Sequence, residues 1–86
     1  MDEGQESLQD QLPPELVRIL DELYQEYQRS RAPLSLARLS KRTELRMSTL
    51  RRFLTALEEA GIAVVVVNDD GTGNAILTAA GLKLHG

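Results

Sequence analysis

Aliphatic residues recur every three or four positions in three successive segments of this 86-residue chain, and this spacing constrains the fold most. The segments are 14–29, 36–42 and 47–60, and each is expected to form an amphipathic helix. Ser35 has the side chain of an N-cap for the second helix, and Gly61 suits the end of the third. The chain therefore predicts three helices that share one apolar core.

A β-hairpin is predicted after the third helix. Residues 62–67 are mostly β-branched and favour a strand, and the turn-forming cluster at 68–74 leads to a second strand at 75–77. Thr78 can cap a short terminal helix that runs through Leu84. This order predicts an α+β fold with a three-helix core, a sheet of two or three strands and a short C-terminal helix.

Composition limits the class of protein. The chain is 42% hydrophobic but only 3% aromatic, so we expect an aliphatic core in one small domain over 13–86. Residues 1–12 are polar and acidic and are expected to form a flexible arm. The absence of cysteine excludes disulfides and thiolate metal sites, and no apolar run approaches the ~18 residues of a membrane span. We therefore expect a cytoplasmic protein without a membrane partner.

Charge is distributed unevenly along the chain. Residues 29–52 hold eight basic side chains against one acid, Glu44, which is a local charge of +7, whereas 1–28 carry −7 and 53–86 carry −3. The net charge of −3 therefore hides a basic patch on the second and third helices. A cationic helical surface on an otherwise acidic protein indicates a polyanion partner, and duplex DNA is the leading candidate.

The third helix offers an outward face that suits the major groove of DNA. With Leu50 toward the core, Arg52 can pair with guanine through two hydrogen bonds. Ser48 and Thr55 are short enough to reach a base edge or a phosphate. The acidic pair at 58–59 would be repelled by phosphates, so only the first two turns of the helix are expected to enter the groove.

Basic side chains beside this outward face suit the DNA backbone. Arg46 and Arg51, which we also expect to point outward, lie nearer the flanks and suit phosphates. Arg38, Lys41 and Arg42 on the second helix are expected to lie near the flanking backbone.

Residues 34–66, LSLARLSKRTELRMSTLRRFLTALEEAGIAVVV, resemble the DNA-binding domain of bacterial winged-helix regulators such as MarR-like proteins. The matching residues are Leu39, Ser40, Leu45, Ser48-Thr49-Leu50, Leu54, Leu57 and the EEAGI stretch at 58–62. LTAAGLKL at 77–84 resembles that family's exit from its wing. The resemblance covers 14–84 and implies a winged helix-turn-helix that binds double-stranded DNA, regulates transcription and is not an enzyme. It also implies that Thr49 belongs to the DNA-contacting set.

Three features depart from the family pattern. Position 44, commonly a left-handed glycine, is Glu44, which predicts either ~1 kcal/mol of backbone strain or a different turn. Position 46, commonly a capping Ser or Thr, is Arg46, which cannot cap in that way. Asp69 and Asp70 make the hairpin tip acidic, which argues against a minor-groove contact by the wing.

Two surplus apolar surfaces predict a subunit contact. The strand at 62–67 has valines on both faces, so the hairpin is either covered by the terminal helix or paired with a second subunit. Val17 and Tyr24 widen the apolar stripe of the first helix, and they either cover the domain's own margin or meet a partner. We expect a homodimer on an operator of two half-sites, with its recognition helices ~34 Å apart.

A winged helix can alternatively serve as a protein-docking module in a larger assembly. A continuous positive face over the second and third helices favours DNA, whereas a patch broken by Glu44 and Glu59 favours an acidic protein. An enzyme has almost no support, because His85 is the only histidine and no catalytic, metal or cofactor motif is recognisable. The residues do not indicate a small-molecule effector.

Overall fold

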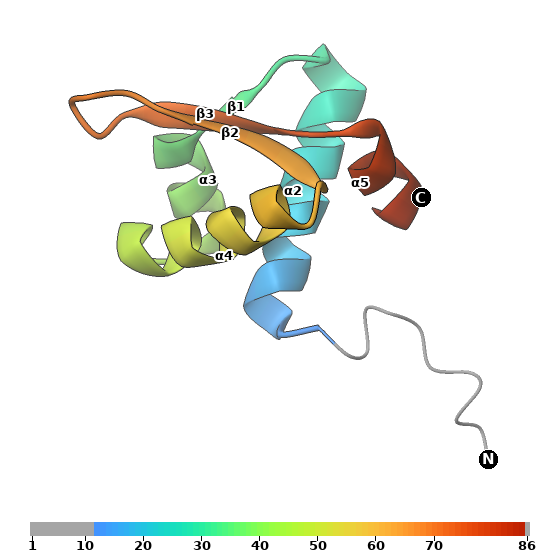
Figure 1. Ribbon diagram of the computed structural model, residues 1–86, viewed down its shortest axis with the longest axis horizontal. Coiled ribbons are helices and arrows are strands. Elements are labelled where there is room, and N and C mark those ends of the chain that lie inside the picture. The colour runs from blue at the N-terminus through green and yellow to red at the C-terminus, as the bar shows by residue number, and fades with distance from the viewer. Residues whose placement is uncertain (1–11, 86) are drawn as a thin grey trace.

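The computed structural model describes residues 12–85, so the predicted arm, apart from Leu12, lies outside the described residues (Figure 1). The elements follow the predicted order: α2 (Pro14–Ser30), β1 (Leu34–Ser35), α3 (Leu36–Thr43), α4 (Met47–Glu59), β2 (Ala63–Val67), β3 (Gly73–Leu77) and α5 (Ala79–His85). Within this described part of the chain, no helix is long and apolar enough to cross a bilayer.

The helices and the sheet enclose an aliphatic core, as predicted. Its buried members are Ile19, Leu20, Leu23, Leu34, Leu36, Leu39, Leu50, Leu54, Leu57, Ala63, Ala75 and Leu77. Burying a large aliphatic side chain contributes roughly 1.5–3 kcal/mol. On α2 the buried stripe is centred on Ile19, whereas Leu16 and Tyr27, at the same helical spacing, are only half-buried. Leu16 and Tyr24 are partly buried and pack against this core, so part of the surplus stripe covers the domain's own margin.

Local hydrogen bonds explain where the helices begin and end. The Ser35 hydroxyl accepts the backbone N–H of Arg38 at 3.2 Å and caps α3, and the Thr78 hydroxyl accepts that of Gly81 at 3.1 Å in α5. Gly61 follows α4 with a φ of 77°, in the left-handed region. The predicted caps and the predicted helix end are thus confirmed.

The three strands form one antiparallel sheet in the order β1-β3-β2. β3 begins at Gly73, two residues earlier than predicted, because it pairs with β2 along its whole length, up to Val67 opposite Gly73. A Cβ added at Gly73 would lie 2.0 Å from the carbonyl oxygen of Val66, so this position requires glycine. Because β3 lies between β1 and β2 in the sheet, β2 is an edge strand.

The two faces of the sheet differ in what covers them. α3 and α4 lie on one face, and α5 lies at the end of the sheet away from the hairpin tip (Figure 1). Val64 and Val66 form a valine face on the other side and are 50% and 47% exposed. α5 packs against α2 and β3 and leaves these valines open, so the terminal helix is not their cover.

Candidate nucleic-acid interface

A tight turn of three residues, Glu44 to Arg46, joins α3 to α4. Glu44 adopts the left-handed conformation with a φ of 62°, so the chain accepts the predicted strain instead of forming another turn. The Ser40 hydroxyl donates to the Leu45 carbonyl at 2.5 Å, and the buried Thr43 hydroxyl donates to the Leu39 carbonyl at 2.7 Å. The first bond ties α3 to the turn that precedes α4, and the second lies within the last turn of α3.

α4 buries one face and presents the other to solvent. Leu50, Leu54 and Leu57 are buried as predicted, while Phe53 is only half-buried. On the opposite face Ser48, Arg52 and Thr55 are exposed, and Thr49 is half-buried. The first three turns of α4 therefore carry short polar side chains around one free guanidinium.

The N-terminus of α4 has no side-chain cap. Arg46 occupies the N-cap position with extended backbone and makes no capping hydrogen bond, as predicted. The first N–H groups of a helix lack intrahelical acceptors and favour an anion. This end of α4 is thus electropositive and adjoins an arginine.

Four basic side chains of the helix-turn-helix are exposed and pair with no carboxylate in residues 12–85. Arg38 and Lys41 lie on α3, Arg46 lies in the turn, and Arg52 lies on α4. Glu44 is exposed and is the one acid between Arg38 and Arg52. We call these four residues the free cations, and their charge is available to a polyanion.

Arg42, one of the predicted DNA contacts, is paired inside the protein. Its Nη1 lies 3.3 Å from Glu26 Oε1 and 3.8 Å from Glu22 Oε1. Glu26 also accepts Arg29 Nη2 at 2.5 Å and the Ser30 hydroxyl at 2.9 Å. The Arg29 guanidinium, then the Ser30 hydroxyl and Arg42, lower the pKa of Glu26 to about 2. Two of the eight basic residues are therefore compensated by α2.

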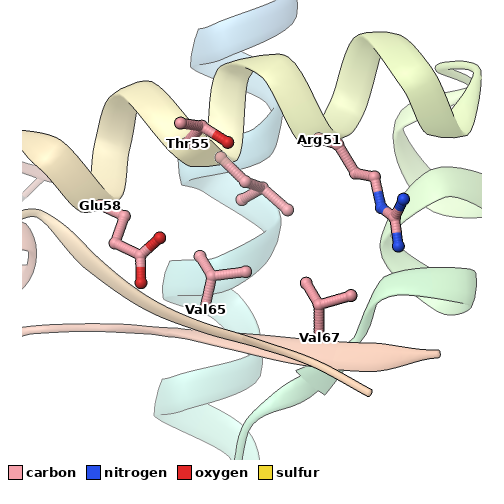
Figure 2. Close-up of a pocket in the computed structure, with 6 residues that line it drawn as sticks. Arg51, Thr55, Glu58, Val65 and Val67 are labelled. Atoms are coloured by element: carbon pink, nitrogen blue, oxygen red, sulfur yellow. The ribbon is translucent and has the colours of Figure 1, made fainter. Parts of the chain in front are cut away.

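Arg51 turns toward the hairpin, so its predicted outward orientation is wrong, whereas its contact with a phosphate stays a prediction (Figure 2). Its Nη2 donates to the Gly71 carbonyl at 3.3 Å, and its Nε is buried without a partner in the described chain. Arg51 stands at one end of a groove of about 260 Å³ between α4 and β2, whose other lining residues are Leu54, Thr55, Glu58, Val65 and Val67. The side chain thus links α4 to the hairpin tip.

The hairpin tip is organised by an acidic residue. The Asp70 carboxylate accepts the hydroxyl of Thr72 at 2.6 Å and its N–H at 3.0 Å. These two bonds lower the pKa of Asp70, so it stays ionised. Asp70 and Gly71 share a further groove with the first residues of α3 and with Met47, which places the acidic tip beside the start of α4.

The sequence analysis did not predict two sets of hydrogen bonds that stabilise the fold. Arg18 Nη1 donates to the Thr43 carbonyl at 3.0 Å, at the C-terminal end of α3 where carbonyls lack helical partners. The two residues are 25 positions apart, so no local pattern signals the bond. The hydrogen bonds that Arg29 and Ser30 donate to Glu26 do have a signal in the sequence, because these residues follow the i,i+3 and i,i+4 spacing of helical neighbours.

Comparisons with known proteins agree with this geometry. The IclR helix-turn-helix domain family matches residues 28–66, a range that includes α3 and α4. A "putative DNA-binding protein" from Ralstonia eutropha, known from its crystal structure, is 43% identical over 85% of this chain and 91% of its own, with a TM-score of 0.79. No curated protein matches the sequence.

Two longer regulators share the fold. MepR, a transcription regulator of the Staphylococcus aureus multidrug efflux pump MepA, has a TM-score of 0.72 at 25% identity over 96% of this chain and 58% of its own. A MarR-family transcriptional regulator from Silicibacter pomeroyi has a TM-score of 0.68 at 26% identity over 86% of this chain and 47% of its own. The chain spans about half the length of these two regulators.

Proposed function

This chain belongs to the winged helix-turn-helix family of DNA-binding transcription regulators, and we propose that it binds double-stranded DNA sequence-specifically as a homodimeric bacterial regulator in the cytoplasm. The free cations of the helix-turn-helix carry the proposal. Unpaired basic side chains at the two helices of this fold match the positions from which such proteins contact phosphates and bases.

Each exposed residue of the helix-turn-helix has a role in this proposal. Arg52 reads a guanine from the first two turns of α4, because its guanidinium has no partner in the described protein and can reach two acceptors. Ser48, Thr49 and Thr55 contact base edges or phosphates. Arg38, Lys41 and Arg46 neutralise phosphates on the flanking backbone. Arg42 and Arg51 contact phosphates only if DNA displaces the contacts that these two side chains make within the protein.

The acidic hairpin tip limits the pose. Asp69 and the ionised Asp70 would be repelled by phosphates, so the wing stands clear of the minor groove. Two features support this: the tip carries no basic residue, and Asp70 is engaged in shaping its own turn. The binding energy then comes from α3 and α4.

Random-site selection with the purified protein tests the proposal. We expect one enriched motif, and fluorescence anisotropy should show affinity for it falling steeply between ~50 and ~200 mM salt, because phosphate contacts release counterions. Lys83→Gln removes an exposed cation of α5 and serves as the matched control, which should leave the salt dependence unchanged. No enriched motif together with salt-insensitive binding would refute the DNA role and favour the docking module for an acidic protein.

A further inference from the structure

The groove between α4 and β2 runs along the open edge of the sheet (Figure 2). We call it the edge groove. The side chains of Val65 and Val67 point from the strand toward α4, and those of Arg51 and Glu58 point from the helix toward the strand. One wall of the edge groove is therefore a helix, and the other is a strand that has no second neighbour in residues 12–85.

Two hydrogen bonds at the ends of the hairpin show which backbone groups of β2 face its partner strand. The N–H of Asn68 donates to the Thr72 carbonyl at 2.7 Å, and the N–H of Thr78 donates to the Ile62 carbonyl at 2.9 Å. Ile62 and Asn68 therefore direct their backbone groups toward the side of β3. Because this direction alternates along a strand, every second residue between them does the same.

Val65 and Val67 direct their backbone groups the other way, toward the open edge. No hydrogen bond links these N–H and C=O groups to another segment of residues 12–85. Water can satisfy each group singly, but only a second extended backbone matches their two-residue repeat. The edge groove therefore offers the hydrogen-bonding pattern that an added strand requires.

The two ends of the edge groove carry opposite charges. Arg51 lies at the hairpin end and makes one hydrogen bond within residues 12–85, to the Gly71 carbonyl, so its guanidinium keeps donors for a carboxylate. Glu58 lies at the other end, is exposed and pairs with no cation in the described chain. Leu54 and Val65 make the lining between them apolar.

We propose that the edge groove binds an extended segment of a partner protein, which adds a fourth strand to the sheet beside β2. Antiparallel pairing is the more stable arrangement, and it places the N-terminal end of the segment near Arg51. The segment then carries an acidic side chain opposite Arg51, an apolar side chain opposite Leu54 and Val65, and a basic side chain opposite Glu58. This interaction goes beyond the proposed function, because it requires no DNA.

The spacing of the two charges matches alternate positions of a strand. Arg51 and Glu58 are seven positions apart on α4, which is ~10.5 Å along the helix axis. The Arg51 side chain extends toward the hairpin tip, so the charged groups are farther apart than that (Figure 2). Residues i and i+4 of a strand lie on one face and are ~13 Å apart. An acid at i, an apolar residue at i+2 and a base at i+4 therefore fit the edge groove.

A second copy of this chain fits the edge less well than a separate extended segment. Pairing of β2 with the β2 of another copy would bring two α4 helices over two adjacent strands, because α4 packs on β2. Adjacent strands are ~4.8 Å apart, whereas packed helices need ~8–10 Å between their axes. An extended segment without a helix of its own avoids this collision.

Fluorescence anisotropy with the full chain and no DNA tests the site independently of the proposed function. The probe is a fluorescein-labelled, C-terminally amidated peptide, Thr-Glu-Thr-Val-Thr-Lys-Thr, and the control peptide has Glu and Lys exchanged. We expect saturable binding of the probe and roughly 2–10-fold weaker binding of the control, because both charge pairs then become repulsive. Glu58→Lys should abolish this preference. Glu59→Lys, one position along and outside the lining, is the matched variant and should retain it.

Amide hydrogen exchange measured by NMR locates the bound peptide. At a probe concentration of about 100 times Kd, the N–H groups of Val65 and Val67 should exchange ~100-fold more slowly than in the free protein. The N–H groups of Val64 and Val66 face β3 and should be protected in both states. This contrast between alternate residues distinguishes an added strand from binding through side chains alone.

Four outcomes would overturn the proposal. Two are absence of binding at millimolar probe and equal binding of the two peptides. The third is fast exchange at Val65 and Val67 when the protein is saturated with probe. The fourth is protection of these N–H groups without probe: protection that rises with protein concentration would assign the edge to a second copy, and protection that disappears when residues 1–11 are deleted would assign it to the chain's own N-terminal segment.

Discussion

Arg29 and Arg42 lie against Glu26 of α2, whereas Arg46 and Arg52, from the same basic stretch of sequence, have no carboxylate partner in residues 12–85. Arg29 meets Glu26 one helical turn away on α2, and packing of α2 against α3 brings Arg42 beside the same carboxylate. Arg29 links two neighbouring turns of α2, and Arg42 links α3 to α2. The free cations remain available to an external anion. The local charge counted along the sequence thus overstates the positive charge that is available to a polyanion.

The largest expected effect concerns a free cation at the proposed point of base reading. Arg52→Ala should cost roughly 1–3 kcal/mol of discrimination between the selected site and a site in which its guanine is replaced, because a bidentate pair is lost. Anisotropy titrations of both duplexes measure the discrimination, with Lys83→Gln as the control. An Arg52→Ala protein with undiminished discrimination would show that another residue reads the base.

The next effect compares a free cation with a paired one on the same helix. Lys41→Gln should reduce the slope of log affinity against log salt by ~0.9, the value for one phosphate contact, and leave the stability unchanged. Arg42→Gln should keep the slope but lower the melting temperature, because Glu26 loses a partner. If both variants reduce the slope equally, the ion pairs of Arg42 open on DNA and the division into two groups is wrong.

A third effect concerns the acid that lies among the free cations. Glu44→Gly should raise the free energy of unfolding by ~1 kcal/mol, because glycine tolerates the left-handed backbone, and should also strengthen DNA binding. Glu44→Gln is the matched control, since it removes the charge but retains the Cβ, and should strengthen binding without stabilising the fold. Urea unfolding and anisotropy separate the two contributions. Equal stability in the two variants would rule out backbone strain at this turn.

The smallest effect is the pH dependence of the paired group. The folded pKa of Glu26 is about 2, below its ordinary value of 4.5. The ionised carboxylate therefore stabilises the fold fully above pH 4.5, and this contribution is lost as the pH falls from 4.5 toward 2. The stability difference between wild type and Glu26→Gln in urea should be constant near neutral pH and shrink through this window. In an Arg29→Gln background the folded pKa lies closer to 4.5, so the contribution should be smaller and its loss should be complete at a higher pH. A difference that does not vary with pH would mean that these contacts do not depend on the charge of Glu26.

The sequence by itself determined the order of the elements and most of their ends. The helical spacing of Leu50, Leu54 and Leu57, the cap at Ser35 and the glycine at 61 depend on residues within about four positions of one another, which local pattern captures. The turn at Glu44 was also predictable as a position of strain, although the choice between strain and another turn needed the structure.

Tertiary structure alone decided which basic side chains of the helix-turn-helix stay free. Arg42 meets Glu26 across 16 positions, Arg51 meets Gly71 across 20, and Arg18 meets Thr43 across 25. Such contacts form only when helix packing and the hairpin bring distant segments together, and a single sequence carries no local signal for them. An apolar groove at the end of the molecule away from the hairpin tip has the same origin, because α2, α4 and α5 each contribute part of its lining. Local residue spacing therefore specifies the helices and strands, while the charge and shape of the surface follow from how those elements pack.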